Sequence, residues 1–331
     1  MTIQRDQQNK LAGPATLVTA AVMALAVFVV CSGGCGQRQT ITKLEKEPQV
    51  TVMIDPVTGS TRTMPIEEYV KGVVGGEMGR LPTEGGEEAD WPENAYAAQA
   101  ILARTFTMEF LSTHEDQTIS TNVEESQAYK PENITPAISR AVDKTRGLVL
   151  VADGKYLRTW FHSYSGGRTA TAQEGLNFQG EAAHTKSVTL PANEFVPEER
   201  ANWQAEFTFD EIAAALKEKG VDVGQIQDLR VTGRGPSGRV TEITVVGSGG
   251  ERTIHGADFR LALGAEKMQS TLLHEDGFRA ENGRLFLAGK GFGHGVGLSQ
   301  WDAYKMAKEG RTPEEIVLAF YRNAAIEKAW D

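Results

Sequence analysis

The sequence contains very little cysteine. Its two cysteines, Cys31 and Cys35, both lie within the first 36 residues. A disulfide or a cysteine-ligated metal site is therefore excluded in the rest of the chain. That part of the fold must be stabilised by core packing, for which a hydrophobic content of 40% is sufficient.

The sequence also lacks a basic block. It has 34 Lys and Arg residues against 44 Asp and Glu residues, which gives a net charge of −10. Binding to nucleic acid depends on neutralising phosphates, so this charge balance argues against nucleic acid as a partner. An uncharged or cationic partner remains compatible with it.

Metal and nucleotide motifs are missing as well. The sequence has no His-x-x-x-His pair, no Cys-x-x-Cys pair and no Walker loop, and its alternating glycines do not fit a dinucleotide fingerprint. We therefore predict neither a metal ion nor a cofactor.

The N-terminus carries a targeting signal. Residues 11–30 are uncharged and largely apolar, and Arg5 and Lys10 precede them, which is typical of a signal peptide or a membrane anchor. Small residues precede Cys35 as in a lipoprotein cleavage site, although Ser32 stands where an aliphatic residue is usual. Lipidation of Cys35, an uncleaved anchor and simple cleavage all remain open. Each of them places the body outside the cytoplasmic membrane.

Three regions follow from this pattern. Residues 1–36 are the signal peptide or anchor, residues 37–49 are a polar linker, and residues 50–331 form the folded part, with a β-containing insertion at about 180–255. Helices and strands segregate along the chain instead of alternating, which predicts an α+β fold. The predicted helices are 65–78, 92–110, 210–219, 299–308 and one beginning at 312. The predicted strands are 50–54, 148–151, 156–163, 229–232, 240–246 and 252–254, and Asp153-Gly154 forms a hairpin turn between the second and third of them.

Glu77 is the strongest candidate for chemistry. The helix over 65–78 carries an apolar stripe that, when extended, reaches Glu77. Burial disfavours the charged form of a carboxyl, and a carboxyl that keeps its proton near neutral pH can act as a general acid. The alternatives are that Glu77 is exposed past the helix end or is paired with Arg104. Gly72, Gly75 and Gly76 permit close contact on the flank of this helix.

A second unusual stretch is GKGFGHGVG at 289–297, where glycine occupies every second position. As an extended segment it has one face without side chains, against which a long ligand can lie, and His294 projects from the other face. The alternative is a glycine-rich loop with positive φ angles in which His294 is structural. His162 lies where a strand meets a glycine turn. It either holds a ligand or orients a site residue, or it is a buried histidine that bonds to the backbone.

These segments resemble the SpoIID/LytB family, the group of sporulation stage II protein D and the amidase enhancer. The resemblance spans residues 50–326 and rests on these segments: Glu68–Met78, Glu93–Phe106, Phe161–Ser163 with Ser165–Gly167, Gly291–Gln300 with Met306-Ala307, and more weakly Ser126-Gln127 with Tyr129.

The resemblance implies a protein that acts on peptidoglycan. Characterised members look like lytic transglycosylases that cut glycan strands lacking stem peptides, and others are enhancers of cell-wall amidases. The family's catalytic acid corresponds to Glu77. The implied partners are glycan strands, a cell-wall amidase and, through the N-terminal segment, the membrane. The implied substrate-binding residues are Arg104, Gln127, Tyr129, His162, Ser163, His294, Ser299 and Gln300.

Two departures from the family pattern stand out. Some members carry metal-binding residues around the Phe-His-Ser segment, whereas this chain has Ser165 and Arg168 there, which argues against zinc. After Ser299-Gln300 the family usually reads Tyr-Gly-Ala, and this chain reads Trp301-Asp302-Ala303.

Overall fold

The computed structural model describes residues 40–55, 57–83, 86–114, 118–121 and 125–331. The predicted targeting segment at 11–30 and Cys35 lie outside the described residues. Among the helices of the described part, none is long and apolar enough to cross a bilayer. Helices and small, mostly antiparallel sheets build the described chain, which confirms the predicted α+β class.

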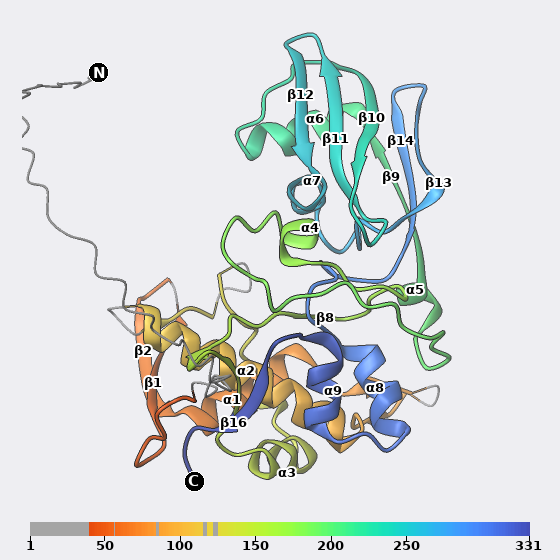
Figure 1. Cartoon of the computed structure of the whole chain (residues 1–331). Helices are drawn as coiled ribbons and strands as arrows, with labels where there is room; N and C mark the ends of the chain where they lie inside the picture. The colour runs from red at the N-terminus through yellow and green to blue at the C-terminus, as the bar shows by residue number, and fades with distance from the viewer. Residues whose placement is uncertain (1–39, 56, 84–85, 115–117, 122–124) are drawn as a thin grey trace, which may run out of the picture. The chain divides into compact units, whose positions relative to one another are not determined.

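One hydrophobic cluster gathers around a long helix, α2 (Glu93–Thr113), which contacts α1, α3, α8 and α9 (Figure 1). Its alanines Ala95, Ala97, Ala98, Ala100 and Ala103 are all buried, so neighbouring helices can approach its backbone. The other helices in or beside this cluster are α1 (Ile66–Glu77), η1 (Pro131–Asn133), α3 (Pro136–Lys144), α5 (Glu198–Ala201), α8 (Gln300–Lys308) and α9 (Pro313–Phe320). The short helix α4 (Ala172–Leu176) belongs to a separate small cluster with Ala170 and Val296.

Short strands complete this part of the fold. They form the sheets β2-β1-β5, β16-β6-β7, β15-β8 and β3-β4. The strands are β1 (Gln49–Asp55), β2 (Ser60–Pro65), β3 (Leu81–Pro82), β4 (Glu88–Ala89), β5 (Thr118–Ile119), β6 (Leu148–Ala152), β7 (Lys155–Tyr156), β8 (Phe161–His162), β15 (Leu298–Ser299) and β16 (Ala325–Lys328).

A second hydrophobic cluster runs from Trp203 to Leu287 and belongs to two three-stranded antiparallel sheets and two helices. The sheets are β10-β11-β12 and β13-β14-β9. The elements are β9 (Asn202–Thr208), α6 (Phe209–Glu218), β10 (Ile226–Arg234), β11 (Val240–Gly247), β12 (Gly250–His255), α7 (Gly256–Leu263), β13 (Leu273–Glu281) and β14 (Arg284–Lys290). The strand-rich stretch therefore begins and ends later than the predicted 180–255, because β9 pairs with β14 from the far end of the segment.

Several local predictions are confirmed. The helix predicted over 65–78 is α1, which begins one residue after Pro65, and the helix predicted from 312 is α9, with a capping box between Thr312 and Glu315. The predicted turn at Asp153-Gly154 joins β6 to β7, and both residues have positive φ.

Two local predictions are wrong. The strand predicted over 156–163 is broken, because only Lys155–Tyr156 pairs with β6 and Phe161–His162 pairs instead with β15. The predicted linker is docked from residue 41 onward: Leu44 donates a backbone hydrogen bond to Ala329, and Ile41 and Leu44 pack against the first cluster. Polar contacts add to this docking, because Lys43 pairs with Asp331 and the Ile41 amide donates to Glu327 at 3.1 Å.

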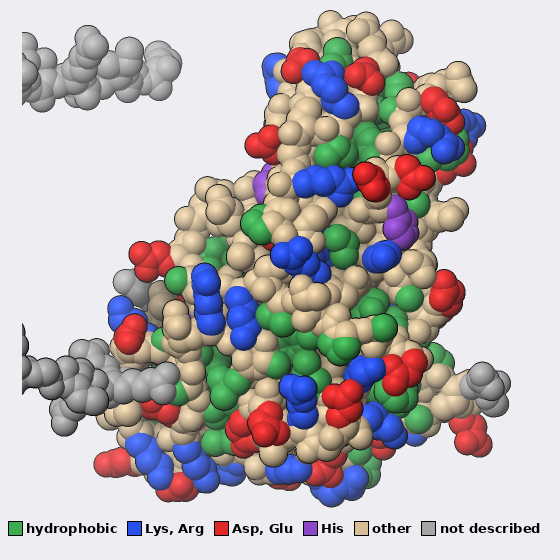
Figure 2. Space-filling view, turned by 45° about the vertical axis from the view of Figure 1, so that its right-hand side comes forward, with side chains coloured by type: hydrophobic (Ala, Val, Ile, Leu, Met, Phe, Trp, Pro, Cys, Tyr) green, Lys and Arg blue, Asp and Glu red, His purple; other side chains and the backbone are tan. Residues whose placement is uncertain are grey.

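Charged side chains of both signs are interspersed on the face of the molecule that Figure 2 shows. Many of them form exposed ion pairs, such as Arg62 with Glu68 and Arg230 with Glu251. Exposed pairs of this kind contribute little to stability, typically 0–1 kcal/mol.

Candidate active site

A cavity of about 280 Å³ contains Glu77, at the C-terminal end of α1. Its wall comes from segments far apart in the sequence: the end of α1, the stretch 125–127, the stretch 158–161 and the glycine-rich stretch near 294. Its polar lining residues are Glu77, Glu125, Ser126, Gln127, Arg158, Thr159 and His294, and its apolar ones are Phe106, Trp160, Phe161 and Leu176.

The apolar stripe of α1 positions Glu77. Ile66, Tyr69, Val70, Val73 and Val74 are fully buried, as predicted. Glu77 continues this stripe at the last turn, so its side chain points toward the interior while its tip reaches the cavity.

The glycines of α1 bring a second segment against the helix. A Cβ added to Gly76 would lie 2.6 Å from the carbonyl oxygen of Ala128, and one added to Gly72 would collide with the ring of Tyr129. The predicted close contact on this flank is therefore confirmed. It allows the backbone N–H of Ala128 to donate a 2.6 Å hydrogen bond to Oε1 of Glu77.

Burial raises the pKa of Glu77 to about 7, and the hydrogen bond from Ala128 opposes that rise. Burial lowers the pKa of His294 to about 3, with further lowering from the positive charges of Arg260 and Arg239. At neutral pH the cavity thus holds a carboxyl that exchanges its proton readily and an uncharged imidazole.

Several lining residues were not predicted from the sequence, among them Glu125, Arg158 and Trp160. Trp160 is held by Tyr321, whose hydroxyl accepts from the Trp160 amide at 2.9 Å and donates to the Trp160 carbonyl at 2.6 Å. All three residues flank stretches that the family resemblance had singled out, and that adjacency is the one signal the sequence offered for them.

Of the predicted binding residues, Gln127 and His294 line the cavity with Glu77. Gln300 lies behind it and donates through Nε2 to the backbone oxygen of Glu77 at 3.3 Å. Tyr129 stacks on Tyr69 with ring centroids 5.3 Å apart.

His162 is buried, its Nδ1 lies 3.1 Å from the carbonyl oxygen of Val296, and its ring centroid is 5.5 Å from that of His294. Ser163 is half-buried, and its carbonyl accepts a hydrogen bond from Trp301. These two residues lie next to the His294 loop and do not line the cavity.

The predicted substrate-binding role of Arg104 is wrong. It is completely buried and pairs with Glu67, with Nη2 to Oε2 at 2.6 Å and Nε to Oε1 at 3.0 Å. Its remaining donors reach backbone carbonyls, among them Leu148 at 2.9 Å. Arg104 therefore neither pairs with Glu77 nor reaches a ligand, because Glu67 and the backbone occupy its donors.

The predicted substrate-binding role of Ser299 is also wrong. It stands before α8 as predicted, but its hydroxyl does not cap the helix. It donates to Asp302 at 2.5 Å and accepts from the amide of Ser165 at 3.0 Å, and the residue is fully buried. Ser299 fastens the turn at Ser165 to α8 and has no access to substrate.

The glycine-rich stretch follows the alternative given for it, a loop with positive φ angles, and not the extended segment. Gly291, Gly293, Gly295 and Gly297 all have positive φ, between 69° and 109°, so residues 291–297 form a loop and not an extended segment. The protein itself fills the space that a glycan was predicted to use. At Gly295 a Cβ would collide with the guanidinium of Arg239, and at Gly297 with the carbonyl of Trp160.

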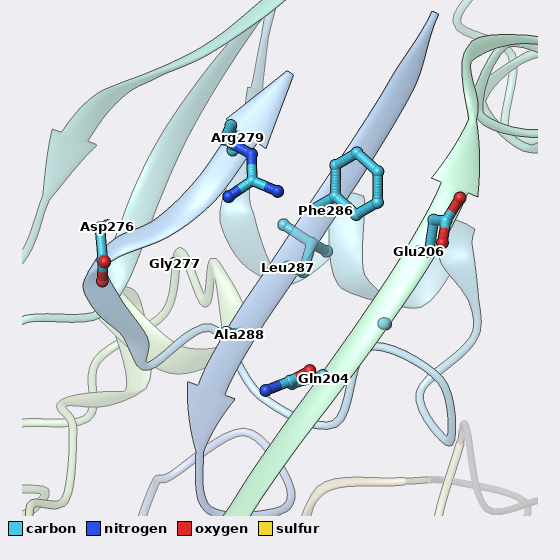
Figure 3. A pocket seen from close by; sticks show the side chains of 9 residues that line it. Gln204, Glu206, Asp276, Gly277, Arg279, Phe286, Leu287 and Ala288 are labelled. Atoms are coloured by element: carbon cyan, nitrogen blue, oxygen red, sulfur yellow. The ribbon is translucent and has the colours of Figure 1, made fainter. Parts of the chain in front are cut away.

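Another hollow lies on the sheet of β9, β13 and β14 and has a volume of about 460 Å³ (Figure 3). Its charged lining residues are Glu206, Asp276 and Arg279. Glu206 pairs with Arg284, and the Arg279 guanidinium lies 5.0 Å from the ring centroid of Phe286. Because its acids are paired or exposed, this hollow lacks a desolvated acid like Glu77, and we place the active site at the Glu77 cavity.

Comparison with known proteins finds a family match. Residues 56–151 match the profile described as Stage II sporulation protein. Stage II sporulation protein D of Bacillus subtilis is 29% identical over 289 residues, which cover 82% of this chain and 76% of that protein. The match to the SpoIID family thus covers residues 56–151, and the chain is similar to a SpoIID protein over most of its length.

Other relatives agree with this assignment. An uncharacterised protein of Brachyspira hyodysenteriae is 29% identical over 79% of this chain and 66% of its own length. The amidase enhancer of Bacillus subtilis is 23% identical over 76% of this chain and 39% of its own length. The chain thus spans just under two thirds of the Brachyspira relative and well under half of the amidase enhancer.

Residues 152–297 match a domain of unknown function, DUF8618. Glu77 and Gln127 lie within the SpoIID match, whereas Arg158, Trp160 and His294 lie within the second match. The Glu77 cavity is therefore built jointly by both matched stretches.

Proposed function

We propose that this protein is a peptidoglycan lytic transglycosylase. It cleaves the linkage from N-acetylmuramic acid to N-acetylglucosamine in peptide-free glycan strands and leaves 1,6-anhydro ends. The observation that supports this most is the Glu77 carboxyl, half-buried at the wall of a cavity with a pKa raised to about 7. Such a group can donate and accept a proton within one catalytic cycle.

The proton balance requires one carboxyl. Glu77 protonates the glycosidic oxygen as the bond from C1 to that oxygen breaks. The C6 hydroxyl of the same muramic acid then forms a bond to C1 and gives its proton to the Glu77 carboxylate. The acid is restored and no water is consumed. Intramolecular attack replaces a bimolecular step, which is worth up to about 7–11 kcal/mol in well-oriented systems.

The remaining cavity residues bind sugar in this proposal. Gln127 and His294 line the cavity and bond hydroxyl or acetamido groups, and the face of Trp160 packs against a sugar ring. Gln300, Tyr129, His162 and Ser163 support them from behind. His294 is uncharged at neutral pH, and its Nδ1 already accepts a 3.0 Å hydrogen bond from the backbone N–H of Val296, so the proton of the neutral ring lies on Nε2.

The cellular setting follows from the family, whose members are proteins of the cell envelope. We place the body on the outer side of the cytoplasmic membrane, held by residues 11–30 or by a lipid on Cys35. Glycan strands are the substrate and a cell-wall amidase is a second partner. The absence of a metal ion and a cofactor from the reaction stays a prediction.

Two alternatives have specific support. The match to the amidase enhancer supports a non-catalytic, glycan-binding role that stimulates an amidase. Glu125 supports a hydrolase, since ordinary glycosidases use a second carboxylate to activate water or attack the sugar.

Mass spectrometry of the products decides between them. Peptide-free glycan strands are incubated with the full-length protein or with its Glu77→Gln variant. Anhydro ends from the parent alone support the transglycosylase. Reducing ends indicate a hydrolase, and intact strands from a folded protein that binds them indicate the enhancer.

A further inference from the structure

Arg158 is an unpaired arginine in the wall of the Glu77 cavity. Among the residues that the structure describes, no carboxylate lies within 4 Å of its guanidinium, and its Nε is buried without an acceptor. Its Cζ lies 5.7 Å from the ring centroid of Phe178. The Arg158 backbone is fixed independently, because its carbonyl lies 2.6 Å from Nε2 of His184.

Other buried arginines of the described chain have acceptors. Arg104 pairs with Glu67, Arg239 donates to the carbonyls of Ser165 and Arg168, and Arg260 donates to the carbonyl of Gln269. Nε of Arg158 and Nε of Arg239 are both buried donors without an acceptor, which is unfavourable. Arg239 is fully enclosed by protein, whereas Arg158 lines a cavity, where a ligand can supply the acceptor. Arg158 differs from the others in facing a cavity and not a backbone.

Arg158 also supplies a positive charge to a cavity wall that holds the carboxyls of Glu77 and Glu125. It is the one Lys or Arg among the described residues of the cavity wall. The cavity is small and partly desolvated, so this cation attracts an anionic group more strongly than an exposed arginine does. Its planar donor set matches a carboxylate.

A glycan strand offers one such group. Its hydroxyl and acetamido groups are neutral, but the lactyl substituent on each muramic acid ends in a carboxylate when no stem peptide is attached. With a stem peptide that same group is an amide, which has no charge and carries a bulky chain. The lactyl carboxylate is thus present only on muramic acids without a stem peptide, whereas any carboxylates of a stem peptide lie farther from the sugar ring.

We propose that Arg158 binds the free lactyl carboxylate of a muramic acid in the Glu77 cavity and thereby selects peptide-free strands. This inference rests on glycan strands being the ligand, as in the proposed function. It does not require that the protein cut them.

The test measures binding with the full-length Glu77→Gln variant, which leaves the strands intact. Two ligands are compared: peptide-free glycan strands, and the same strands with their lactyl carboxylates converted to methylamides. We expect the free-acid strands to bind about 10- to 100-fold more tightly, as a charge-assisted pair provides. Adding Arg158→Gln should bring this ratio to about one by weakening the binding of the free acid alone.

Two further variants serve as controls. Arg158→Lys should keep part of the preference, because it retains the charge and loses the fork of donors. Arg230→Gln makes the same change of net charge at an exposed site on β10, paired with Asp228 and Glu251, and should keep the full preference. Equal thermal midpoints show that each variant is folded.

Equal binding of both ligands by the Glu77→Gln protein would overturn the inference, and so would a preference that survives Arg158→Gln. Cleavage by the parent protein is scored separately. Selective binding without any cleavage refutes the transglycosylase and leaves the role of Arg158 standing. Cleavage of the strands without selective binding supports the transglycosylase and refutes the proposed role of Arg158.

Discussion

The backbone N–H of Ala128 donates a 2.6 Å hydrogen bond to Oε1 of Glu77. The two residues meet because Gly76, beside Glu77 in α1, has no Cβ to hold the segment of Ala128 away. This contact favours the charged form of Glu77, while burial of the same carboxyl favours the neutral form. The balance leaves a pKa of about 7, which suits a group that acts first as an acid and then as a base.

Gly76→Ala should therefore disturb both stability and chemistry. Replacing glycine by alanine inside a helix ordinarily stabilises it by about 0.5–1 kcal/mol. Here the new methyl group would lie 2.6 Å from a backbone oxygen, so we expect destabilisation by about 1–3 kcal/mol. Loss of the Ala128 hydrogen bond should also shift the alkaline limb of activity to higher pH. Urea unfolding and a pH profile of activity measure these two effects. A variant more stable than the parent would contradict the close approach of Ala128 to Gly76.

Glu77→Gln should abolish strand cleavage. Removing a general acid typically lowers the rate by 10²–10⁴-fold, and glutamine cannot supply the proton. The matched control is Glu125→Gln, which removes the other cavity carboxylate. An intramolecular attack does not need it, so the anhydro product should persist within about 10-fold of the parent rate. Loss of product in the Glu125→Gln variant would argue for water as the nucleophile.

The raised pKa of Glu77 predicts how activity depends on pH. The acid must be protonated when substrate binds, so kcat/KM should fall as pH rises above about 7. Initial rates on peptide-free strands between pH 5 and 9 measure this limb. A limb near pH 4.5, the ordinary value for glutamate, would show that Glu77 is not desolvated.

The same pKa predicts that the effect of Glu77→Gln on the free energy of unfolding depends on pH. The folded protein holds the Glu77 proton more tightly than the unfolded chain, so this stabilisation is complete below pH 4.5 and is lost as pH rises through about 7. Glu77→Gln removes the cost of ionisation. Its free energy of unfolding should match the parent at pH 4 and exceed it by about 1–3 kcal/mol at pH 8. Equal values at both pH values would contradict the shift.

Arg104→Met should destabilise the fold strongly. It leaves the buried Glu67 carboxylate without its partner, which typically costs about 3–5 kcal/mol. The control is Arg62→Met, which breaks the exposed pair with Glu68 and should cost less than about 1 kcal/mol. Thermal or urea unfolding measures both. A small effect at Arg104 together with lost strand binding would restore the substrate-binding role that the structure argues against.

Elements with strong local signals follow from the sequence alone. The apolar stripe of α1, the capping box at Thr312 and the turn at Asp153-Gly154 each depend on residues within one or two turns of one another. The hairpin of β13 and β14 had a comparable signal in Asn282-Gly283, both with positive φ, which the sequence analysis passed over.

The glycine-rich stretch shows where local reasoning ends. Alternating glycines are compatible with an extended face or with a loop, and the sequence cannot say what lies against them. The contacts of Gly295 and Gly297 come from Arg239 and Trp160, both far away in the chain. Those neighbours leave no room for a side chain at Gly295 or Gly297.

The sequence by itself determined the α+β class, the helix that carries Glu77 and the glycines that open its flank, because each of these depends on short-range periodicity and sterics. Only the tertiary structure decided that Arg104 pairs with Glu67, 37 residues away in the chain. It also decided that Glu125, Arg158 and His294 line one cavity with Glu77. Burial, and with it the pKa of a carboxyl and the free donors of an arginine, depends on which distant segments exclude water from it. That information is not contained in any one stretch of the chain.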